Sequence, residues 1–417
     1  MSDFLLISPY FPPMNYVGAK RALHFCRHLP AHGWTPAVVA LPADIERDAA
    51  LDALVPDVPL LRNLRGGPVA WLEDLGDRFV ADPVSAASGG RKGPAKAKGP
   101  LTAKLDDLRA LAAGTLGVLD RFAKYLPWAL PRVIAFARKH RCKLVYANSG
   151  PVSANLLADA VARALNLPVV HDLRDPWSLE PNFRARWNAN GAALVERLEA
   201  AWFARADRVI LNTRAAYEAH VEAYADRLPA ERFTFIRNQF DPDLYGEPAA
   251  PPAADDPFRI IYYGHLRPSK NAGLFVEALH RFIAEEAIAP GGLEFHTFGD
   301  VTRDDAAAVE ALGLTPYFFH RDWLPFTDSP SVLGGADLLL DLMGPGHHLQ
   351  ISGKIYDYFA AGRRILAISP NHELDDIFAE TGAGTRVDLN ADAIVKGLRA
   401  AWRARKAGAP VTLDPAR

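Results

Sequence analysis

Short apolar runs alternate with longer amphipathic stretches along the first half of the chain. The runs FLLIS (4–8) and LPVVHDL (167–173) have the length of buried strands. The stretches GAKRALHFCRHLPAHG (18–33) and SANLLADAVARALN (153–166) space their apolar residues along one face of a helix. This strand–helix rhythm predicts a parallel sheet covered by helices, with ligand-binding residues just after the strands.

The same rhythm begins again at FRIIYYG (258–264) and continues through LFVEALHRFIAEE (274–286), LEFHTFG (293–299) and ADLLLDLM (336–343). Between the two sets lies PAAPPAADDP (248–257), a Pro/Ala-rich segment with little to bury, as in a linker. The sequence therefore predicts two α/β domains. We place the N-terminal domain at 1–245 with an insertion at about 80–105, the linker at 246–257, the C-terminal domain at 258–390, and a helix and tail at 391–417.

Composition narrows the function classes. A length of 417 residues exceeds what one hydrophobic core usually organises, which agrees with two domains. The net charge is -2, so the global charge balance does not indicate nucleic acid as a partner.

The cysteines and the apolar runs bear on the cellular compartment. Cys26 and Cys142 have no metal-type spacing, which suits a reducing compartment. No apolar run approaches the ~18 residues of a membrane span, and residues 4–8 follow no positive segment of the kind that starts a signal peptide. We expect a cytoplasmic protein, with the inner face of the membrane as an allowed position.

The stretch SAASGGRKGPAKAKGP (85–100) contains four basic residues and no acidic residue. We favour a disordered surface insertion for it. The alternative is a weak peripheral contact with anionic lipid, helped by the basic amphipathic stretch LPRVIAFARKHRCK (130–143).

The nonapeptide VVHDLRDPW (169–177) brings four chemically capable side chains to the end of a predicted strand: His171, Asp172, Arg174 and Asp175. From the residues alone, His171 paired with Asp172 is the obvious general base. Trp177 is better suited to packing or to lining a substrate site than to reacting.

Gly18 is followed, after Ala19, by two cations, Lys20 and Arg21, in a predicted first helical turn. Cations there oppose the helix dipole, so they indicate a nearby anion such as phosphate. A single glycine with surface lysines is equally common without a ligand, and both interpretations stay open.

Two stretches of the second half predict a diphosphate site. In YYGHLRPSKN (262–271), Arg267 and Lys270 follow a strand end. In MGPGHHLQISGKIYDYFAAG (343–362), a glycine-rich loop leads into a helix at Gly353 and Lys354, whose free N–H groups can hold phosphate oxygens. Asp357, one turn further on, is a candidate for accepting ribose hydroxyls, and an exposed helix carboxylate is the alternative.

We predict no metal site. His24, His28 and His32 are spaced like a helical metal stripe, but Pro30 should end the helix first and no carboxylate completes the set, so we interpret them as surface residues. Two further patterns carry little weight: His347 and His348 in a glycine-rich loop, and the DPD of 241–243, which we interpret as a turn.

The order of these motifs resembles the retaining, family-four glycosyltransferases of the GT-B fold, in particular bacterial transferases that build surface polysaccharides. The resemblance is carried by FPPMNYVGAKRALHF (11–25), VVHDLRDPW (169–177), IIYYGHLRPSKN (260–271) and GKIYDYFAAGRRILAIS (353–369). It covers nearly the whole chain apart from roughly residues 45–120 and the C-terminal end.

The resemblance implies two Rossmann-like domains with parallel sheets that face a central cleft. It implies a metal-independent, retaining hexosyltransferase without a cofactor, whose co-substrate is a nucleotide-diphosphate sugar and whose acceptor is a glycan, a lipid-linked or a small molecule. Helix 391–417 would pack back toward the N-terminal domain. The resemblance assigns Gly18, Lys270, Gly353, Lys354 and Asp357 to the donor site, and Arg267 as a substitute for an arginine that usually follows the glycine at position 264.

Three departures bear on activity. The first acid of the family's E-x7-E pattern falls at Leu349, with Gln350 beside it as a partial substitute. The family's catalytic histidine aligns with Arg174, so Arg174 and Asp175 rank before His171 and Asp172 as site residues. A sugar-nucleotide epimerase of the same fold and a catalytically reduced nucleotide-sugar-binding subunit remain the alternatives to an active transferase.

Overall fold

The structure, a computed structural model, describes residues 2–14, 17–40, 49–62, 64, 66–67, 118–120, 122–241, 252–253, 255–323 and 328–408. The insertion predicted at about 80–105, most of the linker predicted at 246–257 and the tail after residue 408 lie outside them. The chain divides into two compact units. The first holds most of the chain up to residue 211 together with 220–234, and the second holds 235–417 together with short pieces such as 212–219.

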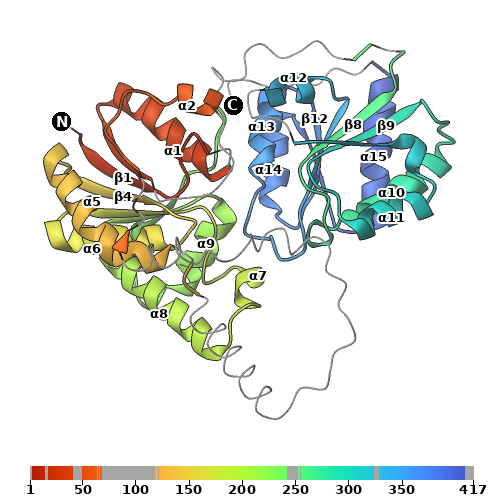
Figure 1. Ribbon diagram of the computed structural model, residues 1–417. Helices are drawn as coiled ribbons and strands as arrows, with labels where there is room; N and C mark the ends of the chain where they lie inside the picture. The colour runs from red at the N-terminus through yellow and green to blue at the C-terminus, as the bar shows by residue number, and fades with distance from the viewer. Residues whose placement is uncertain are drawn as a thin grey trace, which may run out of the picture. The chain divides into compact units, whose positions relative to one another are not determined.

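The first unit contains a seven-stranded sheet in the order β3-β2-β1-β4-β5-β6-β7 (Figure 1). Its strands are β1 (Phe4–Ser8), β2 (Pro36–Ala40), β3 (Leu60–Leu61), β4 (Leu144–Asn148), β5 (Val169–Leu173), β6 (Arg208–Leu211) and β7 (Phe233–Phe235). Its α-helices are α1 (Val17–His28), α2 (Ala49–Ala53), α5 (Leu126–His140), α6 (Ser153–Leu165), α7 (Pro181–Arg184), α8 (Ala189–Arg205) and α9 (Arg214–Ala223), with 3-10 turns η1 (Leu29–His32), η3 (Ala123–Tyr125) and η4 (Ala230–Arg232). Residues 212–219, which include the start of α9, are assigned to the second unit although the rest of the helix belongs to the first.

The second unit contains a six-stranded sheet in the order β10-β9-β8-β11-β12-β13. Its strands are β8 (Phe258–Tyr263), β9 (Leu293–Phe298), β10 (Phe318–Arg321), β11 (Leu338–Leu342), β12 (Arg364–Ile368) and β13 (Gly384–Val387). Its helices are α10 (Ala272–Glu285), α11 (Arg303–Ala311), α12 (Ser329–Gly334), α13 (Lys354–Ala361), α14 (Glu373–Thr381) and α15 (Ala391–Lys406), with 3-10 turns η6 (Pro268–Lys270) and η7 (Thr315–Tyr317).

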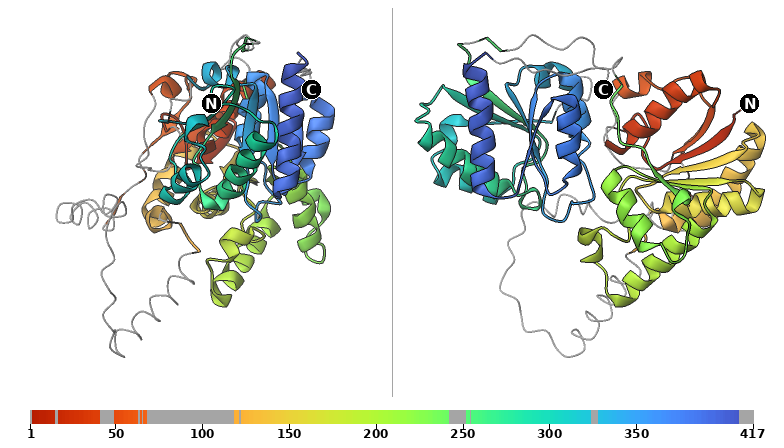
Figure 2. Two further views of the ribbon diagram at one scale, coloured as in Figure 1. Left: turned by 90° about the vertical axis from the view of Figure 1, so that its right-hand side faces the viewer. Right: turned by 180° about the vertical axis from the view of Figure 1, so that it is seen from behind.

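Each sheet is buried on both faces, which explains why its central strands are continuous apolar runs. In β1, Leu5 and Ile7 pack with α5 and α6, whereas Phe4 and Leu6 pack with α1. In the second unit, α10 and α15 cover one face and α12, α13 and α14 cover the other (Figures 1 and 2). All strand pairs with a described register are parallel, for example Phe4 with Leu144. The predicted fold class of two Rossmann-like α/β domains is therefore confirmed.

The last helix packs within the second unit. In α15, Ile394, Val395 and Leu398 are buried in the core of the second unit, where the helix packs against α10, β12 and β13. Its apolar residues follow a helical period, so one face of the helix is covered by this core. A contact of this helix with the first unit stays a prediction.

Two smaller expectations concern burial. Cys26 and Cys142 are buried free thiols. The interpretation of His24 as a surface residue is wrong, because its side chain is only 3% exposed on the packed face of α1.

The basic stretch 130–143 buries Val133 and Ala137 in the unit's own core, so its apolar side packs inside the protein. Within the described ranges, no helix combines the length and the apolar character of a membrane span.

Candidate functional site

The chain order of the first sheet reverses between β1 and β4. Open parallel sheets bind ligands outside the carboxyl ends of the strands at such a switch point. Gly18, at the start of α1, follows β1, and Gly150, with φ of +93°, follows β4. The guanidinium of Arg174 lies against both glycines: a Cβ on Gly18 would come within 1.8 Å of Arg174 Nη1, and one on Gly150 within 3.8 Å of Arg174 Cζ. Gly18 therefore makes room for a cation at the switch point, whereas a Cβ on Gly150 would only be in van der Waals contact with it.

Asp172 is engaged in a buried ion pair. Its carboxylate accepts hydrogen bonds from Arg21 Nε at 2.7 Å, from Arg21 Nη2 at 3.1 Å and from the Tyr146 hydroxyl at 2.8 Å. The exposed fraction is 0% for Asp172 and 3% for Arg21. This pair joins α1 to β5, and it accounts for a cation in the first turns of α1 without a bound anion. Asp172 is therefore placed to hold the fold rather than to meet a substrate.

The side chain of His171 also points into the protein interior. Its side chain is fully buried, and its Nδ1 lies 3.0 Å from the amide nitrogen of Asn155. Burial lowers the pKa of His171 to about 4, so the imidazole is neutral at physiological pH. In this position it can orient Asn155, which reaches a neighbouring pocket, but it does not face solvent.

Asp175 differs from these two residues because its side chain is 35% exposed. Its Oδ2 lies 3.7 Å from Arg174 Nη2, so the carboxylate and the switch-point cation are adjacent. Of the four candidates in VVHDLRDPW, the structure thus brings Arg174 and Asp175 to the end of β5, and it places His171 and Asp172 beneath them.

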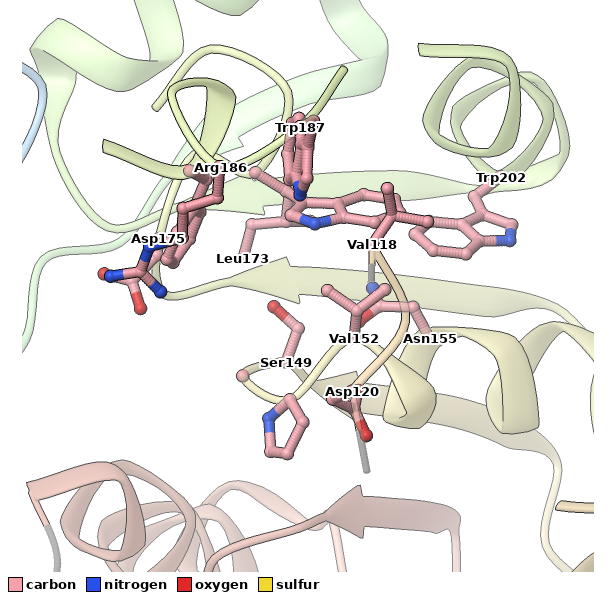
Figure 3. Close-up of a pocket in the computed structure, with 14 residues that line it drawn as sticks. Val118, Asp120, Ser149, Val152, Asn155, Leu173, Asp175, Arg186, Trp187 and Trp202 are labelled. Atoms are coloured by element: carbon pink, nitrogen blue, oxygen red, sulfur yellow. The ribbon is translucent and has the colours of Figure 1, made fainter. Parts of the chain in front are cut away.

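A cavity of about 260 Å³ opens beside Asp175 at the carboxyl ends of β4 and β5 (Figure 3). Part of its wall is aromatic: Trp177 and Trp202 are stacked at 5.1 Å, and Trp187 meets Trp177 edge-on at 6.1 Å. Figure 3 shows Asp175 and Arg186 toward one end, and Trp202 and Val118 toward the other. The cavity is lined by Val118, Asp120, Ser149, Gly150, Pro151, Val152, Asn155, Leu173, Asp175, Trp177, Phe183, Arg186, Trp187 and Trp202.

The second sheet has its switch point between β8 and β11, which are paired through Ile260 and Leu338. Gly264 directly follows β8, and the side chain of Lys354 crosses it so closely that a Cβ on Gly264 would come within 2.5 Å of Lys354 Cε. Lys354 Nζ lies 5.5 Å from the centre of the Tyr262 ring. The glycine therefore allows a lysine from the start of α13 to lie over the end of β8.

Lys270 approaches the same switch point from the loop after β8. Its Nζ is 3.5 Å from the thioether sulfur of Met343, which directly follows β11. The two loops touch closely, because a Cβ on Gly344 would come within 2.2 Å of the Ser269 carbonyl oxygen. Lys270 and Lys354 are thus both placed at the carboxyl ends of the two central strands, as expected for an anion site.

Asp341, near the end of β11, is a buried carboxyl group that the sequence analysis did not single out. Both of its oxygens are buried, and the Ser352 side chain lies close to the carboxyl group. Burial raises the pKa of Asp341, whereas Lys354, Ser352 and Lys270 act in the opposite direction. An acidic residue inside the apolar run ADLLLDLM was the available signal for it.

Arg267 is half exposed and lies 3.5 Å from Asp300. His265 accepts a hydrogen bond at Nδ1 from the Asp300 backbone N–H at 3.0 Å, and its ring stacks on Trp323 at 5.5 Å. Burial lowers the pKa of His265, which agrees with a neutral ring. Arg267 is thus a second cation, besides Lys270, at the surface of the loop after β8.

Helix α13 begins after Gly353, with Lys354 as its first residue and Asp357 in its first turn. Asp357 is half-buried, and Leu349, the residue at the position of the missing acid, is buried. Gln350 is half-buried, and its backbone carbonyl accepts a hydrogen bond from the Asn371 amide at 3.2 Å. The donor candidates of the second unit therefore lie on two adjoining loops and one helix start.

The residues that the structure describes contain no group of three or more His, Cys, Asp or Glu side chains that could hold a metal ion. His347 lies in the loop after β11, where its Nδ1 is 3.2 Å from the Gly344 carbonyl oxygen. Of the DPD motif, Asp241 is buried, and residues 242–243 lie outside the described ranges.

Comparisons with known proteins agree with this architecture. Solved structures that are similar to the chain include the HepE protein of Anabaena in complex with UDP and glucose (TM-score 0.61, 15% identity, 99% of this chain and 93% of that chain covered). A sucrose-phosphate synthase of Thermosynechococcus elongatus is also similar (TM-score 0.63, 13% identity, 99% and 92% covered). A candidate UDP-N-acetylglucosamine 2-epimerase of Listeria monocytogenes is less similar (TM-score 0.51, 12% identity, 99% and 92% covered).

Among curated proteins, no sequence matches the chain. At these identities the solved structures establish the fold, and a sequence-family model adds a second, independent likeness. The chain has the two-domain GT-B fold of glycosyltransferases, and its residues 66–244 match the family model Glycosyltransferase Family 4.

Proposed function

We propose that the protein transfers a hexosyl group, with retention and without a metal ion, from a nucleotide-diphosphate sugar to an acceptor hydroxyl. The observation that carries this proposal is the arrangement at the switch point of the second unit. There, Lys354 lies across Gly264 and Lys270 lies beside Met343, so two cations occupy the ends of adjacent central strands. The UDP and glucose bound to the similar HepE protein support a UDP-sugar as the first donor to test.

In this proposal the second unit binds the donor. Lys270, Lys354 and Arg267 stabilise the negative charge that develops on the leaving diphosphate, and the free N–H groups at Gly353 contribute to the same anion site. One well-placed donor of this kind contributes ~3–4 kcal/mol to transition-state stabilisation. Asp357 binds the ribose hydroxyls as an acceptor of hydrogen bonds.

The first unit binds the acceptor in this proposal. Asp175 is the candidate for orienting or deprotonating the acceptor hydroxyl, since it is the exposed carboxylate of VVHDLRDPW. Arg174 cannot take up a proton and suits an anion instead. Gly18 serves by leaving space for Arg174. His171 and Asp172 have supporting roles in this proposal: His171 holds Asn155 in place, and Asp172 holds α1 in place through Arg21.

Thermal unfolding in the presence of nucleotide sugars tests the donor assignment. We expect one of UDP-, GDP-, dTDP- or ADP-sugars to raise the melting temperature, and we expect Lys270→Ala and Asp357→Ala to remove that shift. Lys396→Ala is the matched control, because Lys396 is exposed on α15, away from the strand ends. A folded protein whose melting temperature responds to none of these compounds contradicts the proposal.

Two other functions fit parts of the molecule. A buried leucine at position 349, in place of the first acid of E-x7-E, favours a nucleotide-sugar-binding subunit with reduced turnover. The similarity to the Listeria protein favours an epimerase. Proton NMR of the anomeric and ring signals separates the three: a transferase gives a new α-linked or β-linked product only with an acceptor, an epimerase changes the sugar without one, and a binding subunit leaves the donor intact.

A role in cell-surface polysaccharide or glycoconjugate synthesis at the cytoplasmic side of the membrane belongs to the same proposal. It rests on the resemblance of the motifs to bacterial polysaccharide transferases. Co-sedimentation with anionic vesicles tests the membrane part, and a protein that stays in the supernatant at low salt removes it.

A further inference from the structure

The aromatic cavity of the first unit has walls and polar groups that fit a particular class of ligand. We propose that it binds one glycosyl ring of the acceptor, packed against the indoles of Trp177 and Trp187 and hydrogen-bonded by Asn155 and Asp175. This inference rests on the proposed transferase function and names the acceptor class as a carbohydrate.

The aromatic walls form a corner. The ring planes of Trp177 and Trp187 meet at 81°, and Trp177 is held by stacking on Trp202 with an angle of 11° between the planes. A pyranose ring carries C–H groups on its faces and hydroxyls around its rim, so one face packs on an indole while the rim stays available to polar groups. The stacked pair fixes the corner before a ligand arrives, which lowers the ordering cost of binding.

Asn155 supplies the first polar contact. It lines the cavity and is 2% exposed, and its Oδ1 has no hydrogen-bond partner in the part of the chain that the structure describes. Its Nδ2 lies 3.0 Å from Nδ1 of the neutral His171. If the amide is turned over, the imidazole N–H bonds the oxygen and the amide nitrogen is left instead. In either orientation one buried polar atom awaits a hydroxyl, and leaving it unpaired costs about 1–3 kcal/mol.

The remaining polar groups distinguish a neutral polyol from other ligands. Asp175 and Arg186 lie toward one end of the cavity (Figure 3), and Asp120 adds a second carboxylate that already accepts the N–H groups of Phe122 and Ser153 at 2.9 and 2.7 Å. The two carboxylates are matched by two guanidiniums, since Arg174 lies 3.7 Å from Asp175, so the charges at the cavity balance and suit a neutral ligand. A purely apolar chain would leave Asn155 unpaired. The volume of about 260 Å³ is below the roughly 300–1,000 Å³ of drug-sized sites, which suits a single ring.

Saturation-transfer NMR on the full chain tests this site with three probes: methyl α-glucoside, methyl β-galactoside and the methyl glycoside of N-acetylglucosamine. We expect at least one of them to receive saturation from the protein, with its ring C–H protons receiving the most. Trp187→Ala should weaken its Kd at least tenfold. Asp175→Asn changes a partly exposed side chain, so it should fold normally and still weaken binding severalfold. Trp34→Ala, in the same unit and 46% exposed, is the matched control and should leave the Kd unchanged.

The inference is overturned if none of the glycosides binds, or if Trp187→Ala and Asp175→Asn bind as the unchanged protein does. It is also overturned if geraniol, an apolar alcohol, binds in the cavity and the glycosides do not. The donor assay is independent, because the candidate donor residues belong to the second unit. A UDP-sugar shift without glycoside binding refutes only this inference, whereas glycoside binding without any nucleotide shift refutes the transferase proposal.

Discussion

Replacing Asp172 by Asn separates a structural role of this residue from a chemical one. The carboxylate is fully buried and accepts two hydrogen bonds from Arg21, itself 3% exposed. Removing one partner of a buried ion pair leaves the other charge uncompensated, which costs about 3–5 kcal/mol. Against a typical total of roughly 5–15 kcal/mol, this is a large fraction of the free energy of unfolding.

The expected shift is large enough to measure easily. For a unit of this size, 1 kcal/mol corresponds to about 2–4 °C, so Asp172→Asn should lower the melting temperature of the first unit by roughly 6–20 °C. Urea unfolding followed by tryptophan fluorescence gives the free energy, since Trp177 and Trp202 are packed in this unit. A double-mutant cycle with Arg21→Met isolates the coupling between the two side chains.

Asp175→Asn is the matched comparison. Its side chain is 35% exposed, so its removal should change the free energy of unfolding by less than about 0.5 kcal/mol. We expect transferase activity to fall with Asp175→Asn at unchanged stability. If Asp172→Asn instead keeps full stability and loses activity, the reasoning is refuted, and Asp172 belongs to the chemistry.

Three further predictions concern single residues. Gly264→Ala should displace Lys354 and weaken UDP-sugar binding at least tenfold, whereas Gly273→Ala, with no atom within 4 Å of its added Cβ, should leave thermal shifts unchanged. Burial lowers the pKa of His171 to about 4 in the folded protein, against about 6.5 in the unfolded chain. Between these two values the unfolded state binds a proton that the folded state does not. The free energy of unfolding should therefore fall as the pH drops from 6.5 to 4. His171→Asn should flatten that pH dependence in urea titrations, and an unchanged slope contradicts it. Burial raises the pKa of Asp341, which lies beside both lysines, and its protonation removes a negative charge near the proposed diphosphate site. The affinity for UDP-glucose, measured by calorimetry, should therefore increase at lower pH. Asp341→Asn should remove this pH dependence.

The fold was readable because its central strands are buried on both faces. Runs such as FLLIS and FRIIYYG became β1 and β8 with bounds close to those expected. Elements such as β3, with two residues, carry too few positions for a period to be recognised, and they follow from pairing with a neighbour. The helix at the C-terminal end was expected, but its packing against α10, β12 and β13 was not predicted, since periodicity marks an apolar face without saying what covers it.

The site was readable only in part. The sequence indicated that VVHDLRDPW ends a strand, but the pairing of Asp172 with a residue 151 positions away follows from tertiary structure alone. Asn155 and Trp202 are on helices, where their spacing gave no sign that they meet at one cavity. The glycine–lysine contact at Gly264 likewise joins a loop and a helix start that are far apart in the chain. Local patterns thus located the strand ends, and long-range packing decided which side chains reach the surface there.

The order of the first sheet also has a consequence for synthesis on the ribosome. β1 is a central strand, and one of its two partners, β4, is encoded about 140 residues later, with Phe4 beside Leu144. At ~5–20 residues per second, the ribosome needs roughly 7–28 s to reach that partner. Throughout this interval one edge of the apolar strand β1 stays unpaired, so a chaperone that binds extended apolar peptides would act on this strand during synthesis.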